Sequence, residues 1–175
     1  EKSIKNSELE NLIKNKINKL DKLYGPIESK EFTIVIYPIK NENLIINSPH
    51  WKWSLGITYY NDRIIIKDLS YAHINKSKFI QVLEHELNHL MINRITKGKY
   101  VPRWFKEGFA MYVANEQSMH HKFLVSQAIL KNNLFKLEEL NLFNNLNKKK
   151  FNLAYAQSAV FVENLANIYG NDSIT

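Results

Sequence analysis

The feature that most constrains this chain is the pentapeptide H-E-L-N-H at residues 85–89. Apolar spacing predicts that it lies on one long helix, from about residue 75 to residue 97. Residues four apart share a helix face, so His85 and His89 can direct two imidazole nitrogens at one point. Such a pair is typical of zinc ligands, and Glu86 beside it could accept a proton from a zinc-bound water. We therefore expect a zinc site on this helix.

Successive residues of an α-helix are about 100° apart around its axis, and this spacing divides the predicted helix into two sides. The apolar side carries Phe79, Ile80, Leu83, Leu87, Leu90 and Met91. The other side carries Val82, His85, Glu86, His89 and Asn93. We expect the first side to pack on a core and the second to border a cleft. The alternative is a solvated face on which both histidines and the glutamate are ordinary surface residues.

A third donor is expected in the segment P-R-W-F-K-E-G at residues 102–108, because a catalytic zinc usually has three protein ligands. Its proline suits the start of a second helix, on which Glu107 and Gly108 share a face with Met111. Gly108 would let this helix approach the first closely and bring Glu107 to the metal. Taken alone, Glu107 would be an ordinary surface residue, but with the two histidines it becomes the candidate third ligand.

H-E-x-x-H followed by P-x-W-x-x-E-G-x-A resembles the gluzincin zinc metallopeptidases, particularly the peptidase MA-like domains, and more distantly the large zinc aminopeptidases. The late segment A-Y-A-Q-S-A, continuing to Gly170, is similar to the closing helix of peptidase MA-like domains. The resemblance thus spans roughly residues 53–170. It implies a zincin-like fold, a peptide or protein substrate and one zinc ion held by His85, His89 and Glu107, with Glu86 as general base.

The resemblance also gives Tyr155 a catalytic role, as the donor of a hydrogen bond to the oxyanion of the tetrahedral intermediate. The alternative for Tyr155 is core packing with a satisfied hydroxyl. The sequence has no G-x-M-E-N stretch, with which aminopeptidases of this clan hold the substrate amine, so we expect an endopeptidase. Position 111, where some gluzincins carry a carboxylate that orients a zinc-bound histidine, is methionine, which leaves the partners of the imidazoles unassigned.

The rest of the chain predicts an α+β fold, with a small N-terminal sheet packed on the zinc helix and a mainly helical C-terminal part. The segments that read as strands, among them a two-stranded hairpin around Asn61-Asp62, are residues 32–37, 55–60, 63–67 and, less clearly, 44–46. Helices are expected up to residue 24 and, beyond the zinc helix, at residues 102–115, 118–131 and 153–169, with a short turn at 137–142.

Residues 55–59 are the candidate edge strand that would pair with an extended substrate through backbone hydrogen bonds. Gly56 would permit close backbone approach there. A purely structural hairpin is the alternative. The other histidines, each expected to be a surface or loop residue, are His50, His73, His120 and His121.

The size and composition suit one globular catalytic domain, since the chain has 175 residues of which 45% are hydrophobic. We expect a helix-and-sheet portion at about 1–72 and the zinc helix with a helical portion at about 73–175. No apolar run is long enough for a transmembrane segment. The chain begins at Glu1 rather than Met, so we expect a removed upstream segment and an extracytoplasmic or secreted bacterial protein.

The chain has no cysteine, which leaves histidine and carboxylate as its strong zinc donors. The net charge of +7 fits either an anionic partner or, the interpretation we favour, a solvated lysine-rich surface. The lysine cluster at residues 148–150 lacks interleaved aromatics and is interpreted as a loop, so no nucleic-acid partner is expected. The alternatives to a peptidase are an inactive or narrowly specific zinc-binding interaction module, and a polymer-binding protein with an incidental motif.

Overall fold

The computed structural model describes residues 6–25, 31–37, 54–59, 62–68, 72–142 and 146–170. The chain divides into two compact units, Glu1–Lys99 and Tyr100–Thr175. The candidate strand at 44–46, His50 and Asn61 of the predicted turn lie outside the described residues. The division places the zinc helix with the sheet, and a single catalytic domain over residues 1–175 stays a prediction.

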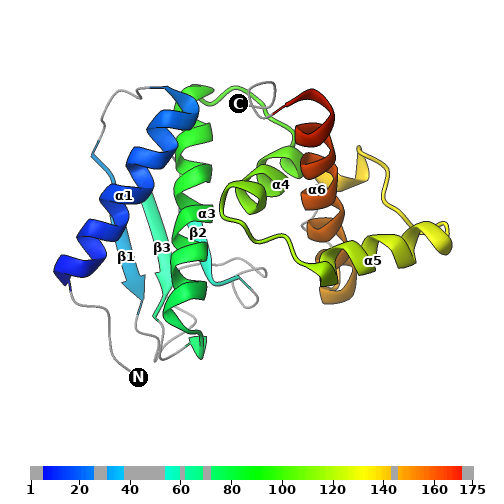
Figure 1. The fold of residues 1–175 in the computed structure, drawn as a ribbon, viewed down its shortest axis with the longest axis horizontal. Coiled ribbons are helices and arrows are strands. Elements are labelled where there is room, and N and C mark those ends of the chain that lie inside the picture. Colours follow the sequence, from blue (N-terminus) through cyan, green and yellow to red (C-terminus); the bar gives the residue numbers. More distant parts are fainter. Residues whose placement is uncertain are drawn as a thin grey trace. The chain divides into compact units, whose positions relative to one another are not determined.

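The first unit contains a three-stranded sheet and two long helices. Its elements are α1 (Asn6–Tyr24), β1 (Thr33–Tyr37), β2 (Gly56–Tyr59), β3 (Arg63–Lys67) and α3 (Lys76–Ile95). The strand order is β1-β3-β2, with β1 parallel and β2 antiparallel to β3, which confirms the predicted hairpin pairing. Helices α1 and α3 lie side by side in front of these strands (Figure 1).

The two faces of the sheet follow the alternation of residues along β3. Ile64 and Ile66 are fully buried, whereas Ile65 lies on the opposite face in a cluster with half-buried side chains of β1 and β2. Strand β2 pairs Gly56 with Ile66 and Thr58 with Ile64. Gly56 and Thr58 therefore share the face of Ile64 and Ile66, on which α3 packs. Strand β1 is exposed at Thr33 and half-buried over the rest of its length.

Helix α3 begins at its predicted place because the Asn75 side chain caps it, accepting a 2.9 Å hydrogen bond from the Lys78 amide. The predicted core side is confirmed, since all of its apolar residues except the half-buried Ile80 are buried. On the side expected to border a cleft, His85 and Glu86 are buried as well. Glu84 and Asn88 are buried as well, which no apolar stripe could indicate.

Helix α1 explains the burial of Glu84 and Asn88. Lys16 Nζ and Lys19 Nζ each lie 2.5 Å from a different carboxylate oxygen of Glu84. The Tyr24 hydroxyl donates to the Asn88 side-chain oxygen. Burying polar groups is costly unless they have such partners, and these contacts join α1 to α3 beside the buried Leu20 of α1.

The second unit is helical, and its elements are α4 (Arg103–Val113), α5 (Met119–Leu130), the short 3-10 helix η2 (Glu139–Asn141) and α6 (Lys148–Tyr169). Helix α6 packs against both α4 and α5. A side chain at Gly108 would place its Cβ 2.3 Å from the Ser158 carbonyl oxygen, so α4 and α6 touch backbone to backbone there.

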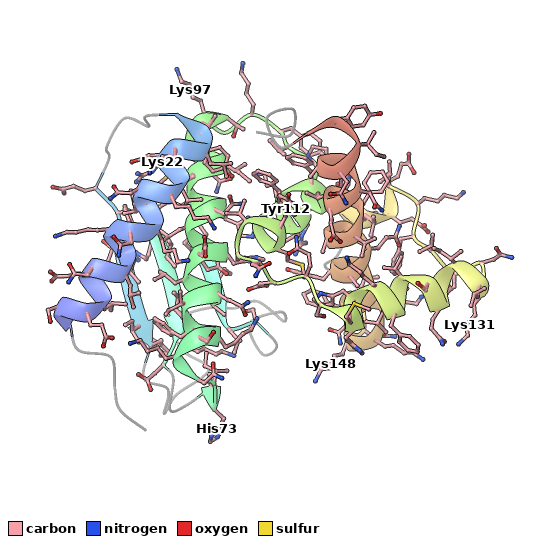
Figure 2. The ribbon with its side chains drawn as sticks, viewed as in Figure 1. Lys22, His73, Lys97, Tyr112, Lys131 and Lys148 are labelled. Carbon is pink, nitrogen blue, oxygen red and sulfur yellow. The ribbon has the colours of Figure 1, made fainter. Side chains whose placement is uncertain are left out.

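Helix α6 begins earlier than the apolar spacing predicted. The interpretation of residues 148–150 as a loop is wrong, because the Asn147 side chain caps the helix with a 3.0 Å hydrogen bond from the Lys150 amide. These lysines form an exposed first turn, and Lys148 points away from α6 (Figure 2). The predicted α+β class, with a small sheet and a helical C-terminal part, is confirmed. None of the described helices has both the length and the apolar character needed to cross a bilayer.

Candidate metal centre

The two motif histidines direct the same ring atom toward each other from successive turns of α3. His85 Nε2 and His89 Nε2 are 3.1 Å apart, and the rings meet nearly edge to face at 76°. Two nitrogens bound to one tetrahedral zinc at about 2.0–2.1 Å would lie about 3.3 Å apart. The spacing of the imidazoles therefore fits a shared metal ion with almost no rearrangement.

The Glu86 carboxylate is held by strand β2. The Thr58 hydroxyl lies 2.7 Å from Glu86 Oε2 and 2.9 Å from the Glu86 carbonyl oxygen. A side chain at Gly56 would place its Cβ 2.7 Å from Glu86 Cγ. Gly56 thus permits the close approach of the Glu86 side chain, and the approach of a substrate backbone stays a prediction.

Glu107 lies on α4 in the second unit, half-buried, with one carboxylate oxygen 3.7 Å from Arg103 Nε. The close helix packing at Gly108 is with α6, and the predicted approach of Gly108 to the helix of the histidines stays a prediction. Gly108 faces α6, where the Ser158 carbonyl and Val162 occupy the space of a side chain. The glycine is required for packing inside the second unit, and this packing fixes the part of α4 that carries Glu107.

Tyr155 lies on α6 and packs its ring against Phe151, with ring centroids 4.6 Å apart. It borders the cluster of Leu140 and Ala154, to which Trp104 also contributes. These contacts are those of the core-packing alternative. The role of Tyr155 as an oxyanion donor stays a prediction.

The remaining described histidines lie apart from the motif in the sequence and on other elements. His73 is exposed before α3 and its side chain points away from that helix (Figure 2). His120 and His121 lie in the first turn of α5, His120 exposed and His121 half-buried.

A comparison with protein-family models matches residues 13–175 to the Peptidase MA superfamily. The chain belongs to the Peptidase MA superfamily. No curated protein and no solved structure gives a match. Membership confirms the peptidase MA-like resemblance and makes this a metallopeptidase-like chain. The expected peptide or protein substrates are those of a peptidase-like domain.

Thr58, Glu84 and Asn88 were not assigned roles from the sequence. Thr58 falls inside the predicted substrate strand, but its contact with Glu86 joins residues far apart in the chain. Glu84 and Asn88 each directly precede a motif histidine, and their partners lie on α1. Side chains alternate between the two faces of a strand, and Thr58 pairs with the buried Ile64. This alternation is the sequence signal that could have placed Thr58 on the face covered by α3.

Proposed function

We propose that the protein is a zinc-dependent endopeptidase. The observation that carries this proposal is the convergence of His85 Nε2 and His89 Nε2 at 3.1 Å, on the helix turn that also carries Glu86. This arrangement is what a Peptidase MA superfamily member needs for metal-assisted hydrolysis.

Three residues supply the metal ligands in this proposal. His85, His89 and Glu107 are a donor set of two imidazoles and one carboxylate, each with one atom to offer an ion. Three protein ligands leave a fourth position for water or substrate, as catalytic zinc requires. The absence of cysteine from the sequence agrees with a histidine and carboxylate site.

Bound zinc would polarise the scissile carbonyl and make the attacking water more acidic. The Glu86 carboxylate accepts a proton from that water as its oxygen bonds to the carbonyl carbon. Glu86 then transfers the proton to the leaving nitrogen as the carbon–nitrogen bond breaks. Because Glu86 is buried and held by β2, its carboxylate needs little reorganisation during these transfers.

The substrate side of the proposal uses β2, which lies at one edge of the three described strands. An extended peptide added along this edge would bind through its backbone, and side-chain pockets would select the sequence. Tyr155 is the proposed oxyanion donor. The extracytoplasmic location expected from the sequence stays a prediction.

The test is cleavage of a mixed peptide library by zinc-loaded wild type, Glu86→Gln and Glu138→Gln. Glu138 is exposed on the second unit, so its variant controls for loss of any carboxylate. We expect Glu86→Gln to keep zinc and lose at least about 100-fold in cleavage rate, because a general base contributes about 10²–10⁴-fold. Glu138→Gln should cleave like wild type.

Internal cut sites in the library would support the endopeptidase proposal. Cuts only at peptide ends would replace it with an exopeptidase. If wild type holds zinc and cuts nothing, the chain is an inactive or narrowly specific zinc-binding member of the superfamily.

A further inference from the structure

Thr58 contacts the Glu86 side chain from the strand across from α3. Its hydroxyl lies 2.7 Å from Oε2, a distance typical of a short hydrogen bond to a charged oxygen. Glu86 itself is 6% exposed, so water has little access to replace this donor. Loss of the hydroxyl would therefore leave a buried carboxylate oxygen without this partner.

The same hydroxyl also reaches the backbone of the residue whose side chain it holds. Thr58 Oγ1 lies 2.9 Å from the Glu86 carbonyl oxygen. The single hydroxyl proton therefore has two acceptors in reach, and both the carbonyl and the carboxylate oxygen belong to Glu86. A β-branched threonine in a strand has few χ1 states, so its hydroxyl is itself well fixed.

Gly56, two residues earlier on the same face of β2, limits the carboxylate from another direction. The position of a Cβ at Gly56 lies 2.7 Å from Glu86 Cγ, 2.9 Å from Oε1 and 3.0 Å from Val82 Cγ1. The Glu86 side chain therefore fills the space above this glycine. The Glu86 carboxylate lies between the backbone of Gly56 and the hydroxyl of Thr58, both on β2.

We propose that Thr58 is a positioning residue that fixes the orientation of the Glu86 carboxylate for proton transfer. The proposal rests on the proposed function, in which Glu86 is the general base. It also gives β2 a double role, because the strand that would bind the peptide backbone also holds the base. In this proposal, β2 therefore sets the position of the substrate backbone relative to the Glu86 carboxylate.

Misplacement of a reacting group by about 1 Å can cost about 100-fold in rate. A lost hydrogen bond to a charged group has a similar effect, about 10- to 100-fold. The Thr58 hydroxyl is occupied by Glu86 and not by the substrate. Its removal should accordingly lower kcat and leave KM nearly unchanged.

The test compares Thr58→Val, which keeps the shape and removes the hydroxyl, with Thr58→Ser, which keeps the hydroxyl. Thr96→Val is the matched control, since Thr96 donates a 2.8 Å hydrogen bond to the Ile92 carbonyl at the end of α3. We expect Thr58→Val to bind zinc like wild type and lose about 10- to 100-fold in kcat. Thr58→Ser and Thr96→Val should stay within about threefold of wild type.

Crystal structures of the zinc-free variants give a second readout that needs no activity. Glu86 should keep its side-chain torsions in Thr58→Ser and leave them in Thr58→Val. Unchanged torsions in Thr58→Val would overturn the proposal, and so would an unchanged kcat. If wild type cuts no peptide, the proposed function fails, while the crystal structures still decide whether Thr58 positions Glu86.

Discussion

Two sides of α3 carry polar residues at adjacent positions, and they differ in what those residues contact. On the α1 side, Glu84 meets two lysines and Asn88 meets a tyrosine. On the other side, His85 and His89 direct their Nε2 atoms at each other. The first side carries polar groups that have partners on α1, whereas the second carries two imidazole nitrogens at the spacing that we propose for one metal ion.

The comparison separates two reasons for burying polar groups on one helix. The contacts of Glu84 and Asn88 hold α1 on α3, so changes there should alter folding stability more than metal binding. In the proposed function, His85 and His89 bind zinc and Glu86 is the general base, so changes there should alter zinc binding or rate more than stability. Neighbouring residues should therefore give opposite results in the same two measurements.

The largest effect on stability should come from removing the two lysines that pair with Glu84. In Lys16→Met/Lys19→Met, the carboxylate, 5% exposed, would stay buried with neither lysine beside it. We expect the free energy of unfolding of zinc-free protein to fall by about 3 kcal/mol, near the low end for an unpaired buried charge, because both lysines are partly exposed. Urea denaturation of the zinc-free protein measures this.

The control is the triple variant that adds Glu84→Leu, which removes the unpaired charge. It should recover most of the lost stability, since apolar replacement of a whole buried ion pair is often neutral. A double variant as stable as wild type would show that these lysines do not hold α1 on α3.

A smaller and pH-dependent effect is expected for Tyr24→Phe. The substitution removes the donor to Asn88, which is fully buried, and should cost about 1 kcal/mol at neutral pH. Burial raises the pKa of the Tyr24 hydroxyl above its ordinary value of 10.0, although the hydrogen bond to Asn88 lowers it in part.

The raised pKa means that the folded protein holds this proton more tightly than the unfolded chain does. The stabilisation is complete below pH 10.0, the unfolded value, and is lost as the pH rises toward the folded value. The stability difference between wild type and Tyr24→Phe should stay constant from about pH 7 to 9 and shrink above pH 10. A difference that is unchanged at pH 11 would contradict the burial of Tyr24.

The parts of the fold set by local sequence were predictable. Asn75 caps α3 at the expected position, and β2 and β3 pair as expected from the two β-rich segments at 55–60 and 63–67. The start of α6 was missed because a capping asparagine before three lysines gives no apolar periodicity. Local propensity therefore located most elements but not every boundary.

The site was predictable where it follows helical spacing and not where it depends on tertiary contacts. His85, Glu86 and His89 stand together because one helix turn separates the histidines. Gly108 was expected to face the zinc helix, but nothing in its spacing distinguishes α3 from α6 as the partner. The contact of Thr58 with Glu86 likewise depends on the register of β2 against β3, which places Thr58 on the same face of the sheet as Ile64.

The most direct test of the central claim is the zinc content of wild type, His89→Ala and Tyr24→Phe after dialysis, by atomic absorption. His89 and the Asn88 contact of Tyr24 lie on different sides of α3, about 100° apart. We predict about one zinc per chain in wild type and in Tyr24→Phe, and none in His89→Ala, because two ligands hold zinc far more weakly than three. Wild type without zinc, or His89→Ala that retains it, would contradict the assignment of this side of α3 to a metal.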